Sequence, residues 1–149
     1  VAGMATKIRP MSWAQLRDVA DDPLVTIGSH THSHSDLVSL SEESITAEMS
    51  IASDRFRSEL GFVPKHFAYP RGIWDARVLK AISPLCESAC TTSGHIATSS
   101  NAPRYAIPRV PVRRSDGWMW FVERIYGRLN GEERIVRLAK RALGRNVGY

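Results

Sequence analysis

The sequence predicts an α/β fold built on a parallel sheet. Short apolar runs typical of strands alternate with amphipathic stretches typical of helices. Such alternation indicates consecutive β-α-β units. The chain has 149 residues, enough for one compact domain and too few for two, so we treat residues 1–149 as a single domain. Three or four strands are few for a closed barrel, so the domain is expected to be incomplete.

The first elements are a helix and a strand that leads into a group of histidines. Ser12 as N-cap and Gln15 form a capping box for a helix over residues 13–20. The apolar, β-branched run from Leu24 to Gly28 predicts a buried strand. Three histidines follow it at once. They would therefore lie at the carboxyl end of a strand, where α/β folds usually place their chemistry.

The longest predicted helix runs from a capping box at Ser39 and Glu42 to a stop at Gly61. Apolar residues recur along it three or four positions apart and form one stripe, which we assign to core packing: Ile45, Met49, Ala52, Phe56 and Leu60.

Strands and helices continue to alternate after Gly61. We predict a strand over residues 65–69, a loop at 70–72, a helix over 75–82 and a strand over 85–92 that holds Cys86 and Cys90, which we interpret as buried thiols. Residues 93–106 read as a loop, and 107–112 as an extended edge segment because of their prolines. Two helices, over 118–129 and 132–143, close the chain.

The net charge of +5 comes from the basic C-terminal helical segment, residues 113–149, with 9 basic and 4 acidic residues. A solvated helix face is the preferred interpretation; an acidic polymer, a membrane surface or nucleic acid are the alternatives. No nucleic-acid recognition motif is present, so we expect no such partner. No apolar run is long enough for a transmembrane segment. The sequence leaves the cellular compartment open.

The strongest chemical signal is the segment Gly-Ser-His-Thr-His-Ser-His at residues 28–34. Neutral imidazole is a common ligand of zinc and similar metals. A helical turn would bring His30 and His34 to one side, whereas an extended backbone would bring all three histidines to one face. Two histidines do not complete a catalytic zinc site, so a carboxylate ligand is also expected.

Residues 27–37 resemble the second motif of the polysaccharide deacetylases (carbohydrate esterase family 4), His-(Ser/Thr)-x-x-His. The resemblance implies that His30 and His34 bind a divalent metal, with zinc preferred and cobalt or another transition metal as alternatives. His32 falls on a variable position of the motif. The implied fold is the distorted (β/α) barrel of this family.

Residues 60–72 are similar to the third motif of the family, which forms one wall of the substrate groove. By position, the backbone N–H of Arg71 would stabilise the oxyanion, and Tyr69 and Pro70 would contact substrate. The later segments also resemble a bacterial branch linked to exopolysaccharide and lipopolysaccharide synthesis. There, Arg109 is assigned a supporting role.

The first motif of the family, Thr-Phe-Asp-Asp, has no match in this sequence. In the family its aspartates supply the general base and the third metal ligand, so we expect a domain that lacks its first strands.

The resemblance implies a metal-dependent hydrolase that removes N-acetyl or O-acetyl groups from a polysaccharide or oligosaccharide, inactive as this chain alone. The alternative is a non-catalytic metal- or carbohydrate-binding remnant. Exposed sheet edges would allow self-association.

Overall fold

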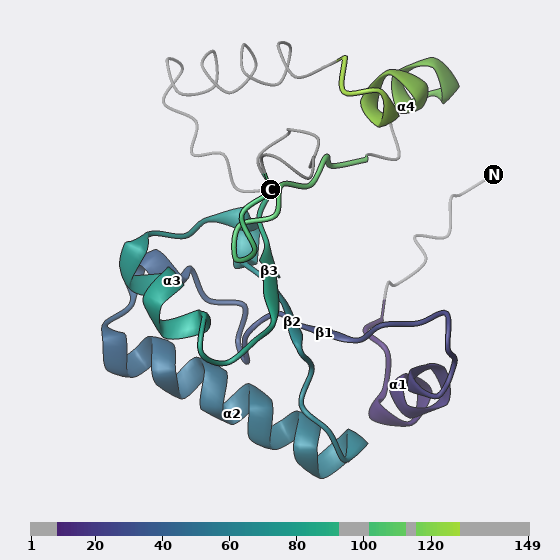
Figure 1. The fold of residues 1–149 in the computed structure, drawn as a ribbon. Helices are drawn as coiled ribbons and strands as arrows, with labels where there is room; N and C mark the ends of the chain where they lie inside the picture. Colours follow the sequence, from purple (N-terminus) through teal and green to yellow (C-terminus); the bar gives the residue numbers. More distant parts are fainter. Residues whose placement is uncertain (1–8, 93–101, 113–115, 129–149) are drawn as a thin grey trace, which may run out of the picture.

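The computed structural model describes residues 9–92, 102–112 and 116–128. The centre is a parallel sheet in the order β1-β2-β3, formed by Gly28–Ser29, His66–Ala68 and Ser88–Cys90. Ile107 extends it by a single parallel bridge to Cys90. Spatial order follows sequence order, as consecutive β-α-β units require. The α/β class and the parallel sheet are confirmed, and the strands within the described residues form an open sheet (Figure 1).

Two helices connect the strands and lie on the same side of the sheet (Figure 1). Helix α2, Glu42–Leu60, joins β1 to β2, and α3, Ala76–Ile82, joins β2 to β3. A buried core lies between the helices and the sheet, formed by Leu37, Ile45, Met49, Phe67, Tyr69, Val78, Ile82 and Ala89. The predicted stripe on α2 is confirmed at Ile45, Met49 and Ala52.

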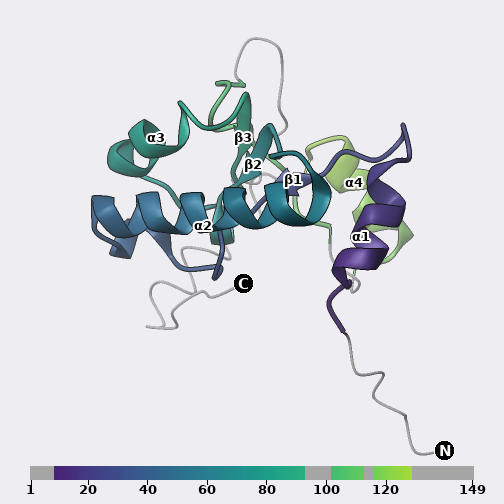
Figure 2. The ribbon, with the colours of Figure 1, turned by 90° about the horizontal axis from the view of Figure 1, so that it is seen from below.

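Helix α1, Trp13–Ala20, begins at the predicted Ser12–Gln15 capping box and lies against the C-terminal part of α2 (Figure 2). The ring of Trp13 meets the edge of Phe56 at 5.8 Å between centroids, and Arg17 pairs with Glu59 at 3.1 Å. These contacts keep α1 on the α2 side of the molecule.

Two local predictions are wrong. Residues 24–27 form no strand: Asp22 accepts hydrogen bonds from the amides of Leu24 and Val25, which makes a turn, and Leu24 is 93% exposed. The sheet begins only at Gly28, where β2 is close enough to pair. The N-cap of α2 is Ser41, not Ser39, because the Ser41 hydroxyl accepts from the amide of Ser44.

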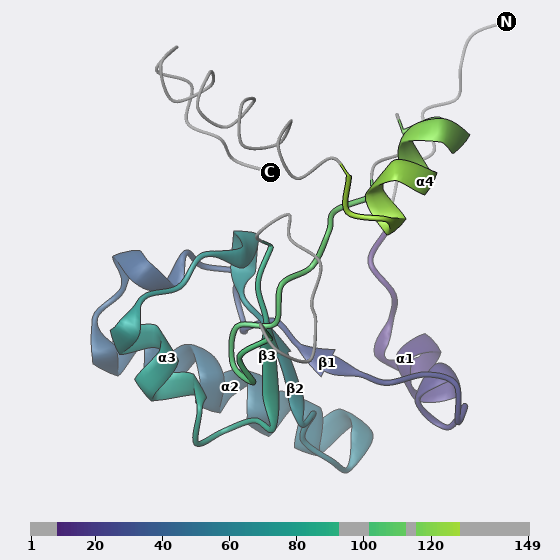
Figure 3. The same cartoon turned by 45° about the horizontal axis from the view of Figure 1, so that its top comes forward.

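The C-terminal region is described in part. Helix α4, Trp118–Ile125, confirms the start of the predicted helix over 118–129, with Gly117 as its N-cap. Figure 3 shows α4 apart from α2 and α3. The predicted helix over 132–143 lies outside the described residues. No helix in the described ranges has the length and apolarity needed to cross a bilayer.

Candidate metal-binding site

The histidine loop, residues 30–34, starts where β1 ends and is fixed first by His30. The Nδ1 atom of His30 lies 2.6 Å from the carbonyl oxygen of Ala68, the last residue of β2. A carbonyl oxygen can only accept, so Nδ1 carries the proton. The other ring nitrogen, Nε2, then keeps a free lone pair, which is the form in which histidine binds a metal.

The loop brings His30 and His34 together without forming either a helix or an extended strand. Their ring centroids are 4.8 Å apart, with ring planes at 69°. Thr31 and His34 both have left-handed backbone conformations, with φ of 69° and 60°. This conformation is unusual for a β-branched residue such as Thr31 and is often found at functional sites. The Thr31 hydroxyl accepts a hydrogen bond of 3.0 Å from the amide of His34.

Glu48, on α2, holds the middle of the histidine loop. Its carboxylate accepts hydrogen bonds from the amides of His32 and Ser33 and from the Ser33 hydroxyl. Partial burial opposes ionisation of Glu48, but the bonds from Ser33 and His32 outweigh it and lower the pKa of Glu48. Sequence reasoning missed this residue. The available signal was its position beside the apolar stripe, directly before Met49.

A second structured turn, η2 at Pro70–Gly72, follows β2. Arg71 has a left-handed φ of 56° and Gly72 one of 69°. The amide of Gly72 donates to the carbonyl of Tyr69 at 2.8 Å. The hydroxyl of Thr91 donates to the carbonyl of Gly72 at 2.5 Å. These bonds fix η2 between the carboxyl ends of β2 and β3, so the amide of Arg71 has a defined position.

The remaining predicted site residues support this turn. Tyr69 is fully buried, and its hydroxyl donates to the carbonyl of Tyr105 at 2.9 Å. Pro70 is buried as well. Because both side chains are buried, we expect them to support the η2 turn from the inside of the molecule. Arg109 donates from Nε to the carbonyl of Thr91 at 3.3 Å, and thus braces the chain after β3.

The histidine pair fits two of the ligand positions of a transition-metal site. Its donors are imidazoles, and His30 already has the outer hydrogen bond that orients a metal-binding ring. Within the described ranges, no group of three or more His, Cys, Asp or Glu side chains is placed to hold an ion. Asp36, two residues after His34, has one buried carboxylate oxygen without a hydrogen-bond partner in the structure. Among the described residues, the local group thus offers two imidazole donors.

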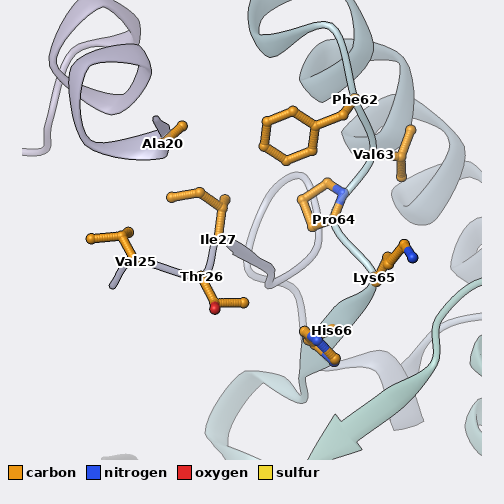
Figure 4. A pocket seen from close by; sticks show the side chains of 9 residues that line it. All are labelled: Ala20, Val25, Thr26, Ile27, Phe62, Val63, Pro64, Lys65 and His66. Carbon is orange, nitrogen blue, oxygen red and sulfur yellow. The ribbon is translucent and has the colours of Figure 1, made fainter. Parts of the chain in front are cut away.

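A separate pocket of about 370 Å³ lies at the amino ends of β1 and β2, opposite the histidines. Figure 4 shows Ile27 and Phe62 on its two sides, with Val25 and Pro64 nearby. The lining is mostly apolar. It contains neither candidate metal ligand, so we do not assign it to the chemistry of the histidine loop.

Comparison with known protein families gives one match, the model described as polysaccharide deacetylase, over residues 3–85. This is more than half of the chain, and it includes the histidine loop, Glu48 and the η2 turn. A comparison with curated protein sequences gives no match.

Several solved structures share the fold. The Streptococcus pyogenes deacetylase PplD, in complex with acetate, has a TM-score of 0.68 at 20% identity and covers 79% of this chain. A polysaccharide deacetylase from Bacillus cereus, BC0361, has a TM-score of 0.65 at 18% identity over 77% of the chain. A de-N-acetylase from Aggregatibacter actinomycetemcomitans has a TM-score of 0.64 at 15% identity over 76% of the chain. The matched region is 52%, 36% and 53% of those chains, so this chain spans about half their length or less.

Proposed function

This chain belongs to the polysaccharide deacetylase family, and we propose that it carries the metal-binding side of an active site that hydrolyses N-acetyl or O-acetyl groups of a polysaccharide or oligosaccharide. The observation that carries the proposal is the histidine pair. The rings are 4.8 Å apart, and the Nδ1 proton of His30 is directed at Ala68, which leaves Nε2 available. The pair lies at the carboxyl ends of the strands, beside η2.

A divalent metal bound by His30 and His34, zinc first and cobalt or another transition metal as alternatives, would polarise the acetyl carbonyl and lower the pKa of a water molecule. The backbone N–H of Arg71 would donate to the oxygen that becomes negative as water attacks. Tyr69, Pro70 and Arg109 would keep η2 in place. The products are acetate and a free amine or hydroxyl on the sugar. The acetate in PplD and the de-N-acetylase among the similar structures support this reaction class.

We propose that this chain alone has little or no activity. The described residues supply two histidines and no third ligand beside them, and the sequence has no Thr-Phe-Asp-Asp motif for the base. The same observation favours the alternative function, a remnant that binds metal or carbohydrate without turnover.

Calorimetric titration of Zn²⁺ into the metal-free chain tests the site. We expect one ion per chain, with binding lost in the His30→Ala/His34→Ala double variant. The matched control is His66→Ala, which removes an exposed histidine at the other end of β2 whose ring bonds to Ser88. Binding that survives the double variant, or that falls equally in the control, would refute the assignment.

Acetate release from N-acetylated oligosaccharides tests whether this chain turns over substrate by itself. No release together with His30-dependent zinc binding supports the inactive-chain proposal. Zinc-dependent release that is lost in His30→Ala would show that the chain is active by itself, and would contradict the remnant alternative.

A further inference from the structure

Glu48 is fixed by the core rather than by the histidine loop that it contacts. It lies on α2 between Ile45 and Met49, which are 0% and 4% exposed. Burial of these neighbours fixes the position of the helix relative to the sheet. The carboxylate of Glu48 therefore reaches the loop from a rigid support.

Three donors from two consecutive loop residues converge on this carboxylate. The amides of His32 and Ser33 lie 3.1 and 2.8 Å from Oε2, and the Ser33 hydroxyl lies 2.7 Å from Oε1. These amides lie between the two left-handed residues, Thr31 and His34. Such backbone turns direct successive N–H groups to one point and favour an anion there. Here the anion is a side chain of the protein itself.

We propose that Glu48 is a positioning residue that holds the histidine loop in its left-handed turn and thereby keeps the ring of His34 against that of His30. Its importance for metal binding rests on the proposed function, whereas its hold on the loop does not. His30 has a separate anchor, the carbonyl of Ala68. Loss of the Glu48 carboxylate should therefore displace His34 and leave His30 in place.

Nuclear magnetic resonance of the metal-free full chain can test this with three variants. Glu48→Ala removes the acceptor, Glu48→Gln keeps one carbonyl oxygen without the charge, and Asp54→Ala is the control. Asp54 is an exposed carboxylate on the same helix that pairs with Arg57. The readouts are hydrogen exchange of the His32 and Ser33 amides and the nuclear Overhauser contact between the two imidazole rings.

We expect amide exchange at His32 and Ser33 to be about tenfold faster or more in Glu48→Ala, because free access to water replaces two charge-assisted bonds. The ring contact should disappear while the bond of His30 to Ala68 persists. The amide exchange rates of Glu48→Gln should lie between those of Glu48→Ala and the wild type, and the rates of Asp54→Ala should match those of the wild type. Zinc affinity should fall about 10- to 100-fold in Glu48→Ala, the loss typical when a residue that orients metal ligands is removed.

Unchanged exchange at Ser33 together with an intact ring contact in Glu48→Ala would overturn the proposal. If Glu48→Ala loses protection from hydrogen exchange throughout α2, the result for Glu48→Gln decides. Faster amide exchange confined to the histidine loop in Glu48→Gln supports the positioning role, and exchange equal to that of the wild type refutes it. If the wild-type chain binds no zinc, the proposed metal function fails, while exchange and ring contact still decide the role of Glu48.

Discussion

At the scale of single residues, the two candidate ligands are held by different parts of the molecule. His30 is attached to the sheet through Ala68, whereas His34 depends on a turn that Thr31 and Glu48 stabilise. His30 should therefore keep its orientation under substitutions that disturb His34. The left-handed conformations of Thr31 and His34 cost about 1–3 kcal/mol each, which the hydrogen bonds to Glu48 offset.

Tyr69 gives a prediction for alkaline pH. Burial, with a smaller contribution from Cys86, raises the pKa of Tyr69 to about 12. In the unfolded chain tyrosine ionises near pH 10, so the stability that neutral Tyr69 contributes is complete below pH 10 and is lost as pH rises towards 12. Tyr69→Phe should lower the free energy of unfolding by about 1 kcal/mol at pH 8, through loss of the bond to Tyr105. The difference from the wild type should shrink between pH 10 and 12.

Urea unfolding at pH 8, 10 and 11.5 measures this change. Tyr126→Phe is the control, because Tyr126 is 64% exposed; it should change the free energy of unfolding by less than about 0.5 kcal/mol. A difference between Tyr69→Phe and the wild type that stays constant over this pH range would contradict the expected titration.

The resemblance of residues 27–37 to the family motif singled out His30 and His34, and the structure places their two rings side by side. It could not predict how they meet, because the backbone conformation of Thr31 is set by tertiary contacts. Glu48 was missed for the same reason. Its partners lie 15 and 16 positions away, and no local pattern links a helix carboxylate to the amides of a distant loop.

At the scale of elements, the η2 turn depends on Gly72 in two ways. Its φ is +69°, and a Cβ there would lie 2.4 Å from the backbone nitrogen of Thr92. Gly72→Ala should therefore lower the free energy of unfolding by about 3 kcal/mol, because left-handed strain and a backbone clash act together. Gly61→Ala separates the two causes, because Gly61 has a φ of +79° but no atom within 4 Å of the added Cβ; it should cost about 1 kcal/mol. Thermal or urea unfolding gives both values, and equal costs would refute the clash.

Helices were predicted better than strands because their signals are local. The Ser12–Gln15 box and Gly61 mark helix ends that need no distant partner, and both are confirmed. A strand needs a neighbouring strand, and Leu24–Ile27 has none at that position. The cap at Ser41 was misassigned to Ser39 because Ser39 and Glu42 have the spacing of a capping box, whereas Ser41 caps through its own hydroxyl without a Glu or Gln three residues later. Leu37–Ser39 instead form a short 3₁₀ turn before α2, and the Ser39 hydroxyl donates to the carbonyl of Asp36.

At the scale of the whole molecule, the sheet has an open edge at β1. In the described part of the chain β1 pairs only with β2, and the apolar side chains of Val25 and Ile27, which precede β1, line the apolar pocket. Unpaired strand edges next to apolar side chains favour pairing with another chain. The alternation of elements predicted the α/β class, but it could not show where the sheet stops, because closure depends on strands beyond this local pattern.

We therefore predict that the chain associates with a second copy through the β1 edge. Val25→Lys places a charge at this edge, where Val25 is 39% exposed, and should shift the molecule towards the monomer. Ile51→Lys is the matched control, since Ile51 is 47% exposed on α2 and does not line the pocket. Light scattering over a concentration series measures the change. A wild type that stays monomeric, or equal shifts in both variants, would contradict association at this edge.

All groups that shape the histidine pair come from one continuous β-α-β unit. The contact that spans the most chain, between His30 and Ala68, joins residues 38 positions apart, and the Glu48 contacts span 15 and 16. Short spans lose little entropy on closure and form early in folding. During synthesis this half of the site can thus take shape soon after Tyr69 leaves the ribosome, before β3 and the C-terminal segment have emerged. A metal ion could then meet its two proposed ligands on a nascent chain.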